Sequence, residues 1–125
     1  MTDLLHFRPC HKLRTPADFE RVYRGGKRSG DGVFAVNALS NELGFARLGM
    51  SVSTRSAGNS VKRNRVRRLI REFFRLTRVT LPALDYVVTS RPGVRSVDRT
   101  RLLNTLEHLF AEVTRKANAP SGPRA

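Results

Sequence analysis

A run of basic side chains between Asn59 and Arg75, NSVKRNRVRRLIREFFR, concentrates residues that could do chemistry. It sets seven cationic side chains against a single acid, Glu72. Six of the seven are arginines, whose planar guanidinium pairs bidentately with phosphate oxygens and stacks on nucleic-acid bases. These residue types therefore favour the binding of a phosphate-rich polymer. The seven are Lys62, Arg63, Arg65, Arg67, Arg68, Arg71 and Arg75.

Helical spacing separates this run into an apolar side and a basic side. At about 100° per residue, the apolar side chains fall within an arc of roughly 80° to 220° measured from Val61. Asn64, Arg68, Arg71 and Arg75 lie opposite that arc, and Arg65 and Arg67 flank them. A solvated helix face is the ordinary alternative, but such a face interleaves more acids to relieve like-charge repulsion. We therefore predict an RNA- or DNA-binding helix, capped by Asn59 or Ser60 and ending near Leu76. Its apolar side consists of Val66, Leu69, Ile70, Phe73 and Phe74.

Groups that could make or break bonds are scattered along the chain. The ten acids occur singly, and the three histidines lack the spacing of a zinc site or an acid/base pair. The single cysteine, Cys10, has no obvious partner, and the glycines form neither a P-loop nor a dinucleotide-binding motif. We expect no catalytic residue and no metal site in this chain.

The overall composition indicates one small basic domain. The chain has 125 residues, 24 Lys and Arg against 10 Asp and Glu, and a formal net charge of +14. Such an excess favours a polyanionic partner, more often a nucleic acid than a membrane. One cysteine excludes an internal disulfide. Without an apolar stretch of about 20 residues or a signal peptide, the chain is expected to be soluble and cytoplasmic.

The rest of the sequence divides into short elements. Thr15-Pro16-Ala17-Asp18 combines a capping hydroxyl, a proline at the first helical position and an acid in the first turn, which predicts a helix over residues 16–24. Residues 45–53 show the alternation of side chains expected of a strand with one buried face. Arg47, Gly49 and Ser51 then lie on the other face, which could meet solvent or a ligand. The other predictions are a basic loop at 27–32, a strand at 33–39, a turn at 40–44, a Ser/Arg/Gly loop at 54–58, a buried central strand at 85–90, and a last helix that Ser96 caps.

The two ends of the chain differ from this pattern. Residues 1–14 predict an extended basic arm or a frayed terminus, and residues 117–125 a disordered tail. A single domain then spans residues 1–116. Within it, the order of strand, basic helix and strand predicts a parallel pair joined by a crossover.

Two segments resemble the bacterial ribonuclease P protein subunit. They are Leu48-Gly49-Met50-Ser51-Val52-Ser53 and the run from Gly58 to Glu72, which contains Arg63-Asn64-Arg65. The resemblance covers roughly residues 10–116. It implies an α+β fold, a single αβββαβα domain like the second domain of ribosomal protein S5. It also implies a left-handed βαβ crossover, whereas such crossovers are right-handed in about 98% of cases.

The resemblance also implies a function. Such proteins assemble with a large catalytic RNA, which removes the 5′ leader from precursor tRNA using Mg²⁺ that the RNA mainly binds. The implied partners are ribonuclease P RNA and precursor tRNA, with no membrane and no obligatory protein partner. By position, the implied contacts to the RNA subunit are Lys62, Arg63, Asn64, Arg65, Arg67, Arg68, Arg71 and Arg75. The implied leader-binding cleft, between the sheet and the first helix, is formed by Lys12, Arg14, Phe19, Tyr23, Phe34 and Val36.

Alternatives to these assignments follow from the residues themselves. Phe19 and Tyr23 could simply pack in the core of an amphipathic helix. A structural RNA-binding protein of the ribosomal type would have the same composition. A DNA-binding regulator is disfavoured, because no compact helix pair with a three- or four-residue turn precedes the basic helix.

Overall fold

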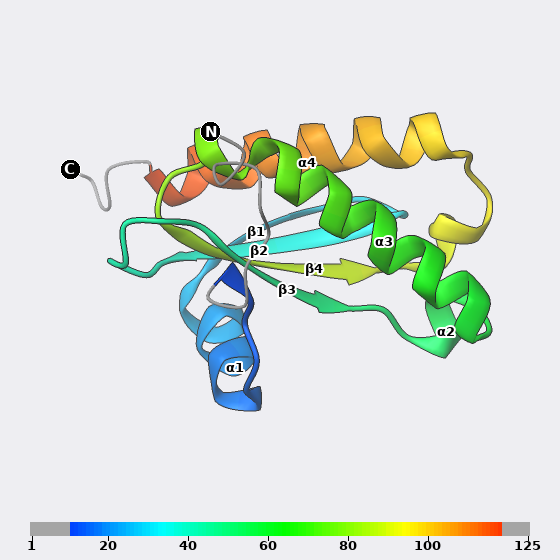
Figure 1. Ribbon diagram of the computed structural model, residues 1–125, viewed down its shortest axis with the longest axis horizontal. Coiled ribbons are helices and arrows are strands. Elements are labelled where there is room, and N and C mark those ends of the chain that lie inside the picture. Colours follow the sequence, from blue (N-terminus) through cyan, green and yellow to red (C-terminus); the bar gives the residue numbers. More distant parts are fainter. Residues whose placement is uncertain (1–10, 119–125) are drawn as a thin grey trace.

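The computed structural model describes residues 11–118, which form a four-stranded sheet with helices on both faces (Figure 1). The elements are α1 (Pro16–Gly25), β1 (Lys27–Gly30), β2 (Phe34–Ser40), β3 (Arg47–Ser51), α2 (Thr54–Ala57), α3 (Ser60–Thr77), η3 (Arg78–Thr80), β4 (Leu84–Ser90), η4 (Pro92–Arg95) and α4 (Arg99–Asn118).

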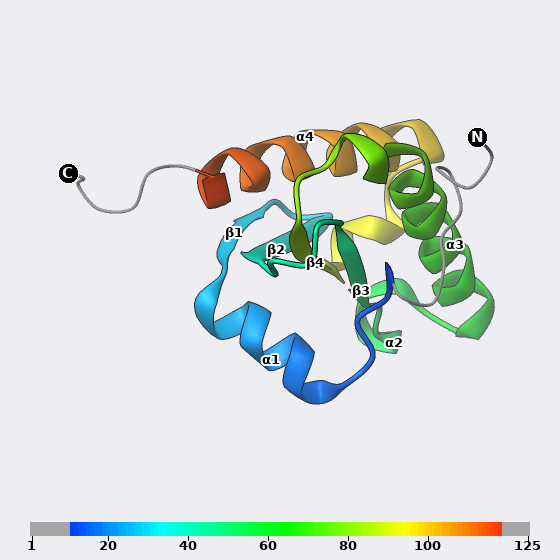
Figure 2. The same cartoon turned by 60° about the vertical axis from the view of Figure 1, so that its left-hand side comes forward.

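The strand order in the sheet is β1-β2-β4-β3. β1 pairs with β2 and β2 with β4 in antiparallel fashion, whereas β3 and β4 are parallel. Helix α3 makes the crossover between the parallel strands on the face that α4 also covers, while α1 lies against the other face (Figure 2). The crossover is left-handed, and the α+β fold class that the resemblance implied is confirmed.

Two apolar clusters hold these layers together. The larger one lies between the sheet and helices α3 and α4, and includes Ile70, Tyr86 and Leu106, each fully buried. The smaller one lies under α1 and joins Val22 to Leu13 and Val87. Strand β4 therefore contributes to both clusters, which confirms it as the buried central strand. The apolar arc predicted for α3 is also confirmed, with Val66, Leu69, Ile70 and Phe74 buried and Phe73 partly buried.

The predicted caps are correct for two of the three long helices. The Thr15 hydroxyl accepts the backbone N–H of Asp18 at 3.1 Å, and the Asn59 side chain accepts that of Lys62 at 3.0 Å. Ser96 does not cap α4. It ends η4, and the Asp98 carboxylate instead accepts the backbone N–H of Arg101 at 2.9 Å.

Two segments predicted as loops contain regular structure. Residues 27–30 form the edge strand β1, whose charged side chains are typical of sheet edges. Residues 54–57 form the one-turn helix α2, in which the Ser53 hydroxyl accepts the backbone N–H of Ser56 at 3.1 Å.

The described part of the predicted arm is held against the sheet. The backbone N–H of Leu13 donates to the carbonyl oxygen of Leu48 at 2.9 Å, and Lys12 forms an isolated parallel β-bridge with Leu48. Residues 11–14 therefore do not form a free arm. Residues 117 and 118 belong to α4, so the tail predicted from residue 117 is wrong at those two positions. The predictions for residues 1–10 and 119–125 lie outside the described residues. Between residues 11 and 118, no helix is long and apolar enough to cross a membrane.

Candidate nucleic-acid interface

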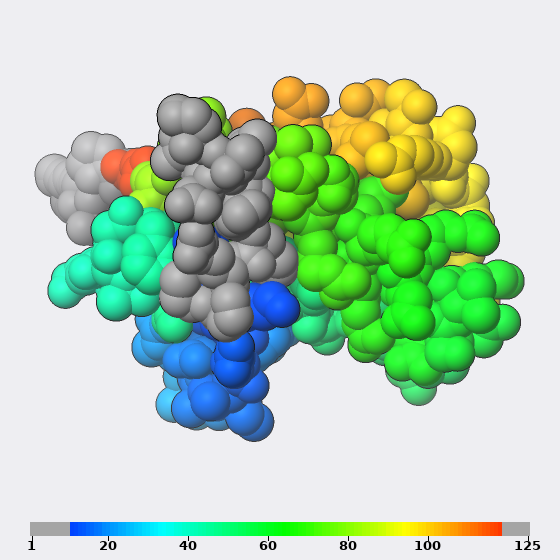
Figure 3. Space-filling view, in the orientation of Figure 1, coloured from blue at the N-terminus to red at the C-terminus, as the bar shows by residue number. Residues whose placement is uncertain are grey.

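Helix α3 presents its cations in two directions rather than along one ridge. Arg65 and Arg68 are exposed and line a shallow hollow together with Val61 and Asn64. We call these four residues the outer face of α3. Figure 3 shows α3, in green, with its outer surface uncovered on the right-hand part of the molecule. A long rigid RNA surface could lie across this face without entering the fold.

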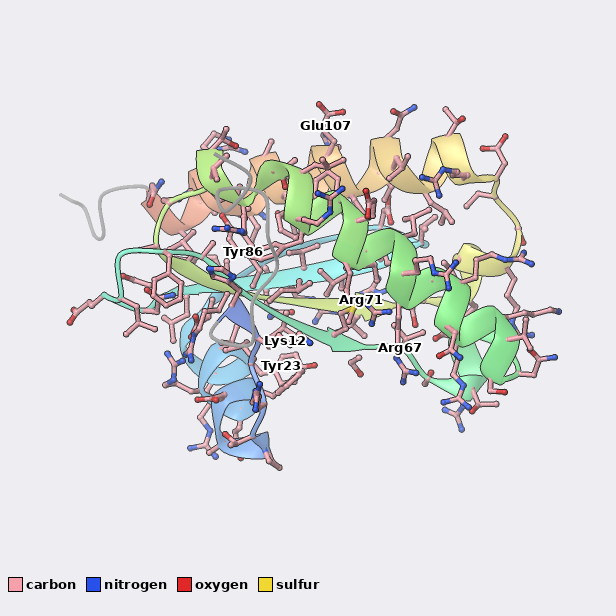
Figure 4. The ribbon with its side chains drawn as sticks, viewed as in Figure 1. Lys12, Tyr23, Arg67, Arg71, Tyr86 and Glu107 are labelled. Carbon is pink, nitrogen blue, oxygen red and sulfur yellow. The ribbon has the colours of Figure 1, made fainter. Side chains whose placement is uncertain are left out.

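Arg67 and Arg71 point instead toward the edge of β3. They line a groove of about 310 Å³ with Lys12, Phe19 and Gly49, and with Leu13, Leu48 and Met50. Figure 4 shows both arginines extending from α3 toward the side where Lys12 and Tyr23 lie. We call this the α1–α3 groove. It combines positive charge from two directions with an aromatic side chain, which suits a single strand of nucleic acid.

Arg63 occupies the same row as Arg67 and Arg71, because the three are spaced four residues apart on α3. All three are half-buried, unlike Arg65 and Arg68. The buried Nε atom of Arg63 has no hydrogen-bond partner among the described residues. Helical winding places this row to one side of the outer face, but without the position of β3 it does not indicate that the row lines a groove.

Phe19 forms part of the groove because of Gly49. A Cβ atom at Gly49 would lie 2.8 Å from Cζ of Phe19 and 3.1 Å from Cβ of Leu13. Only glycine lets the Phe19 ring approach the strand this closely. The ring is half-buried against the small cluster under α1, so one part of it packs and another part lines the groove.

Tyr23 lies one turn further along α1 and is far more accessible. Its side chain is 45% exposed. Its hydroxyl lies 3.5 Å from the hydroxyl of Thr89, on the sheet face that α1 covers. The alternative that Tyr23 simply packs in the core is therefore wrong, whereas Phe19 is partly a core residue.

Phe34 and Val36 do not line the predicted cleft. Both are fully buried in the large cluster on the opposite face of the sheet. The register explains this, because Val36 pairs with Val88 and paired residues share a face. The residues of β3 and β4 that face α1 include Gly49, Ser51, Val87 and Thr89. The alternation of residues 45–53 already indicated Gly49 and Ser51, whereas no comparable alternation pointed to Thr89.

A buried ion-pair network fixes α1 over this face. The fully buried Asp85 carboxylate accepts two hydrogen bonds from Arg47, at 2.8 and 2.7 Å, one from Asn41 at 2.8 Å and one from Arg21 of α1. Burial alone would raise the pKa of Asp85, but these donors outweigh burial and hold that pKa below its ordinary value. The same hydrogen bonds raise the pKa of Arg47. Asp85 is thus ionised and connects α1, β3 and β4.

Of the remaining predicted contacts, Lys62 and Arg14 are exposed, and Arg75 bonds to Glu72 at 2.5 Å. That hydrogen bond lowers the pKa of Glu72 and raises the pKa of Arg75. No group of three or more His, Cys, Asp and Glu side chains that could hold a metal ion occurs within residues 11–118. The arrangement can bind polyanions, and its described residues provide no carboxylate cluster for divalent ions.

Comparison with known proteins decides the family. A family model described as Ribonuclease P matches residues 7–114. The chain belongs to the ribonuclease P protein component family. The ribonuclease P protein component of Methylococcus capsulatus is 38% identical over 117 residues, covering 94% of this chain and 91% of that protein. That of Syntrophobacter fumaroxidans is 42% identical over 106 residues, covering 83% and 88%.

Solved structures agree with the sequence relatives. The RNase P protein of Staphylococcus aureus superposes with a TM-score of 0.77 at 34% identity, covering 83% of this chain and 97% of that one. The RNase P protein of Thermotoga maritima gives a TM-score of 0.71 at 28% identity, covering 83% and 96%. The chain is an RNA-binding subunit in the 5′ processing of tRNA, and part of an endoribonuclease complex.

Proposed function

We propose that the chain binds two RNAs on two sides of α3. The outer face of α3 binds the catalytic RNA of ribonuclease P, and the α1–α3 groove binds the single-stranded 5′ leader of precursor tRNA. The observation that carries the proposal is the division of the α3 arginines. Arg65 and Arg68 are exposed on the outer face, whereas Arg67 and Arg71 line a groove with Phe19 and Lys12.

The composition of the groove supports a single strand as its ligand. Arginine and lysine side chains neutralise a phosphate backbone, while an exposed aromatic ring stacks on bases irrespective of their identity. The exposed Tyr23 ring on the sheet face of α1 provides such a surface. A structural RNA-binding role would need only the outer face, so the groove favours a subunit that also contacts substrate.

We further propose that the RNA subunit, not this chain, performs the hydrolysis and holds the Mg²⁺ ions. The acids among the described residues are dispersed or already paired, as Asp85 is with Arg47 and Glu72 with Arg75. The contribution of the protein is electrostatic. Its cations replace some of the counterions that the RNA phosphates would otherwise recruit.

Replacement of Tyr23 by Ala tests whether the leader continues from the groove along α1, because Tyr23 lies one turn beyond the groove residue Phe19. We expect the reconstituted enzyme to bind precursor tRNA more weakly by about 1–3 kcal/mol, the value of one base–aromatic stack. Binding of mature tRNA, which has no leader, should stay unchanged. Because Tyr23 is exposed, thermal unfolding should also change little.

Tyr23→Phe is the matched control, since it keeps the ring and removes only the hydroxyl near Thr89. It should bind precursor tRNA as the unmodified protein does. Equal losses for precursor and mature tRNA in Tyr23→Ala would mean that the leader does not lie against Tyr23.

A further inference from the structure

A further pocket lies on the side of α3 away from the α1–α3 groove, and it shares only Arg65 with the outer face. It has a volume of about 310 Å³ and is enclosed by α3, by the segment around η4, and by the start of α4. Its walls include Val66 and Leu69 of α3, Val94 of η4 and Leu102 of α4, all buried. At its rim stand the exposed Lys62, Arg65 and Arg99. We call it the α3–α4 pocket.

The rim cations are available to a ligand. Within the described part of the chain, the side chains of Lys62, Arg65 and Arg99 make no hydrogen bond or close ion pair, and the charge of Arg99 contributes to the lowered pKa of Glu72. The other charged groups at the pocket are engaged. Arg95 donates to the carbonyl oxygens of Thr54, Arg55 and Ser56 at 3.0–3.1 Å, and Asp98 caps α4.

Apolar walls beneath three exposed cations suit a nucleotide. The base would enter the pocket and its phosphates would stay at the rim. The volume is at the lower end of the roughly 300–1,000 Å³ typical of small-molecule pockets. Sequence-specific binding of RNA commonly uses unstacked bases in this way.

The position of the pocket indicates which RNA would supply that nucleotide. Arg65 lines both this pocket and the hollow of the outer face, so the two surfaces are continuous. The α1–α3 groove lies on the opposite side of the helix, about 160° away when Arg65 is compared with Arg67. An RNA lying across the outer face reaches the pocket directly, whereas the leader does not.

We propose that the α3–α4 pocket receives one unstacked base of the catalytic RNA, with the flanking phosphates held by Lys62, Arg65 and Arg99. This inference rests on the proposed function, in which the outer face binds that RNA. It adds a base-recognition site to a surface otherwise composed of phosphate contacts.

Chemical probing of base accessibility in the cognate catalytic RNA tests this proposal. Val97→Trp fills the pocket from its half-buried wall without changing charge, and Arg99→Ala removes a rim cation. Arg101→Ala is the matched control, because Arg101 is also an exposed arginine of α4 but does not line the pocket. Thermal unfolding establishes that each variant is folded.

We expect one base to be protected by the unmodified protein and by Arg101→Ala, and to become reactive with Val97→Trp and Arg99→Ala. The affinity of Arg99→Ala for the RNA should fall about tenfold relative to Arg101→Ala, the equivalent of one charge-assisted hydrogen bond. If Val97→Trp does not fold, Arg99→Glu, which leaves the floor intact, replaces it and should expose the same base.

Identical protection by all variants would overturn the pocket proposal and leave the proposed function standing. Failure of the unmodified protein to protect any part of the catalytic RNA would instead overturn the proposed function, and the pocket proposal with it. The two failures are therefore distinguishable in one experiment.

Discussion

Phe19 and Tyr23 lie one turn apart on α1, yet their surroundings differ. Phe19 is half-buried over Gly49, whereas Tyr23 is 45% exposed beside Thr89. Between them, Val22 is fully buried and anchors the helix to the sheet. The exposure of each side chain, rather than its aromatic character, determines whether a substitution affects folding or binding.

Gly49→Ala should destabilise the protein, because its Cβ would lie 2.8 Å from the Phe19 ring and 3.1 Å from Cβ of Leu13. Displacing these groups should cost about 1–3 kcal/mol in the free energy of unfolding, as overpacking typically does. Gly32→Ala is the matched control, since a Cβ there meets nothing within 4 Å. If both variants unfold at the same temperature as the unmodified protein, the Phe19 ring is not held over β3.

For the predicted cleft, the sequence indicated the residue types better than it indicated the face of the sheet on which each residue lies. Lys12, Phe19 and Tyr23 lie on the predicted side of the sheet, but Phe34 and Val36 lie on the other. Apart from Asn37, residues 33–39 are apolar on both faces, so alternation did not indicate which residues face α1. Only the pairing of β2 with β4 supplies that information.

Among the elements, α3 could be predicted almost completely from the sequence. Its cap, its end near residue 77 and its buried side follow from local signals, because a long amphipathic helix is determined by its own periodicity. The division of its arginines could not be predicted in this way. Arg67 and Arg71 line a groove only because the left-handed crossover places α3 beside β3.

The edge strand β1 and the one-turn helix α2 were missed for a related reason. Lys27–Gly30 is polar and short, and becomes a strand through pairing with β2. Thr54–Ala57 is held by contacts distant in sequence, in particular the three hydrogen bonds from Arg95. Such contacts do not appear in any local pattern.

The position of α1 depends on Asp85, whose carboxylate pairs with Arg21 of that helix. Asp85→Asn leaves Arg47 and Arg21 without a charged partner and should cost about 3 kcal/mol in the free energy of unfolding. Glu107→Gln, an exposed site on α4 labelled in Figure 4, makes the same change of charge and should cost almost nothing.

The effect of pH separates these two variants further. Because the pKa of Asp85 in the folded state lies below the ordinary 3.8, its carboxylate stabilises the fold above that pH. This contribution is lost as the pH falls through the folded-state pKa. Unfolding followed between pH 7 and pH 2 should show a steeper acid loss for Glu107→Gln than for Asp85→Asn. Equal slopes would mean that Asp85 is not stabilised as an anion.

The whole molecule carries a net charge of +14, so its effect on RNA cleavage should depend on salt. We predict that purified protein alone leaves precursor tRNA intact, and that adding the cognate RNA at modest Mg²⁺ yields cleavage that the protein enhances. The enhancement should decline steeply with salt, because each displaced phosphate counterion adds roughly 0.7–0.9 to the logarithmic slope. Cleavage at the mature 5′ end by RNA-free protein, shown to lack contaminating nuclease, would contradict the proposed role of the RNA.

The separation of two RNA-binding surfaces by α3 can be measured with Arg65→Ala/Arg68→Ala and Arg67→Ala/Arg71→Ala. These two variants lose the same charge from the same helix. For each, the measurement is the affinity for the catalytic RNA and the ratio of precursor to mature tRNA affinity in the reconstituted enzyme. The outer pair should weaken assembly and leave the ratio unchanged, whereas the groove pair should lower the ratio. Equal effects of both pairs on assembly, with no change in the ratio, would contradict the account.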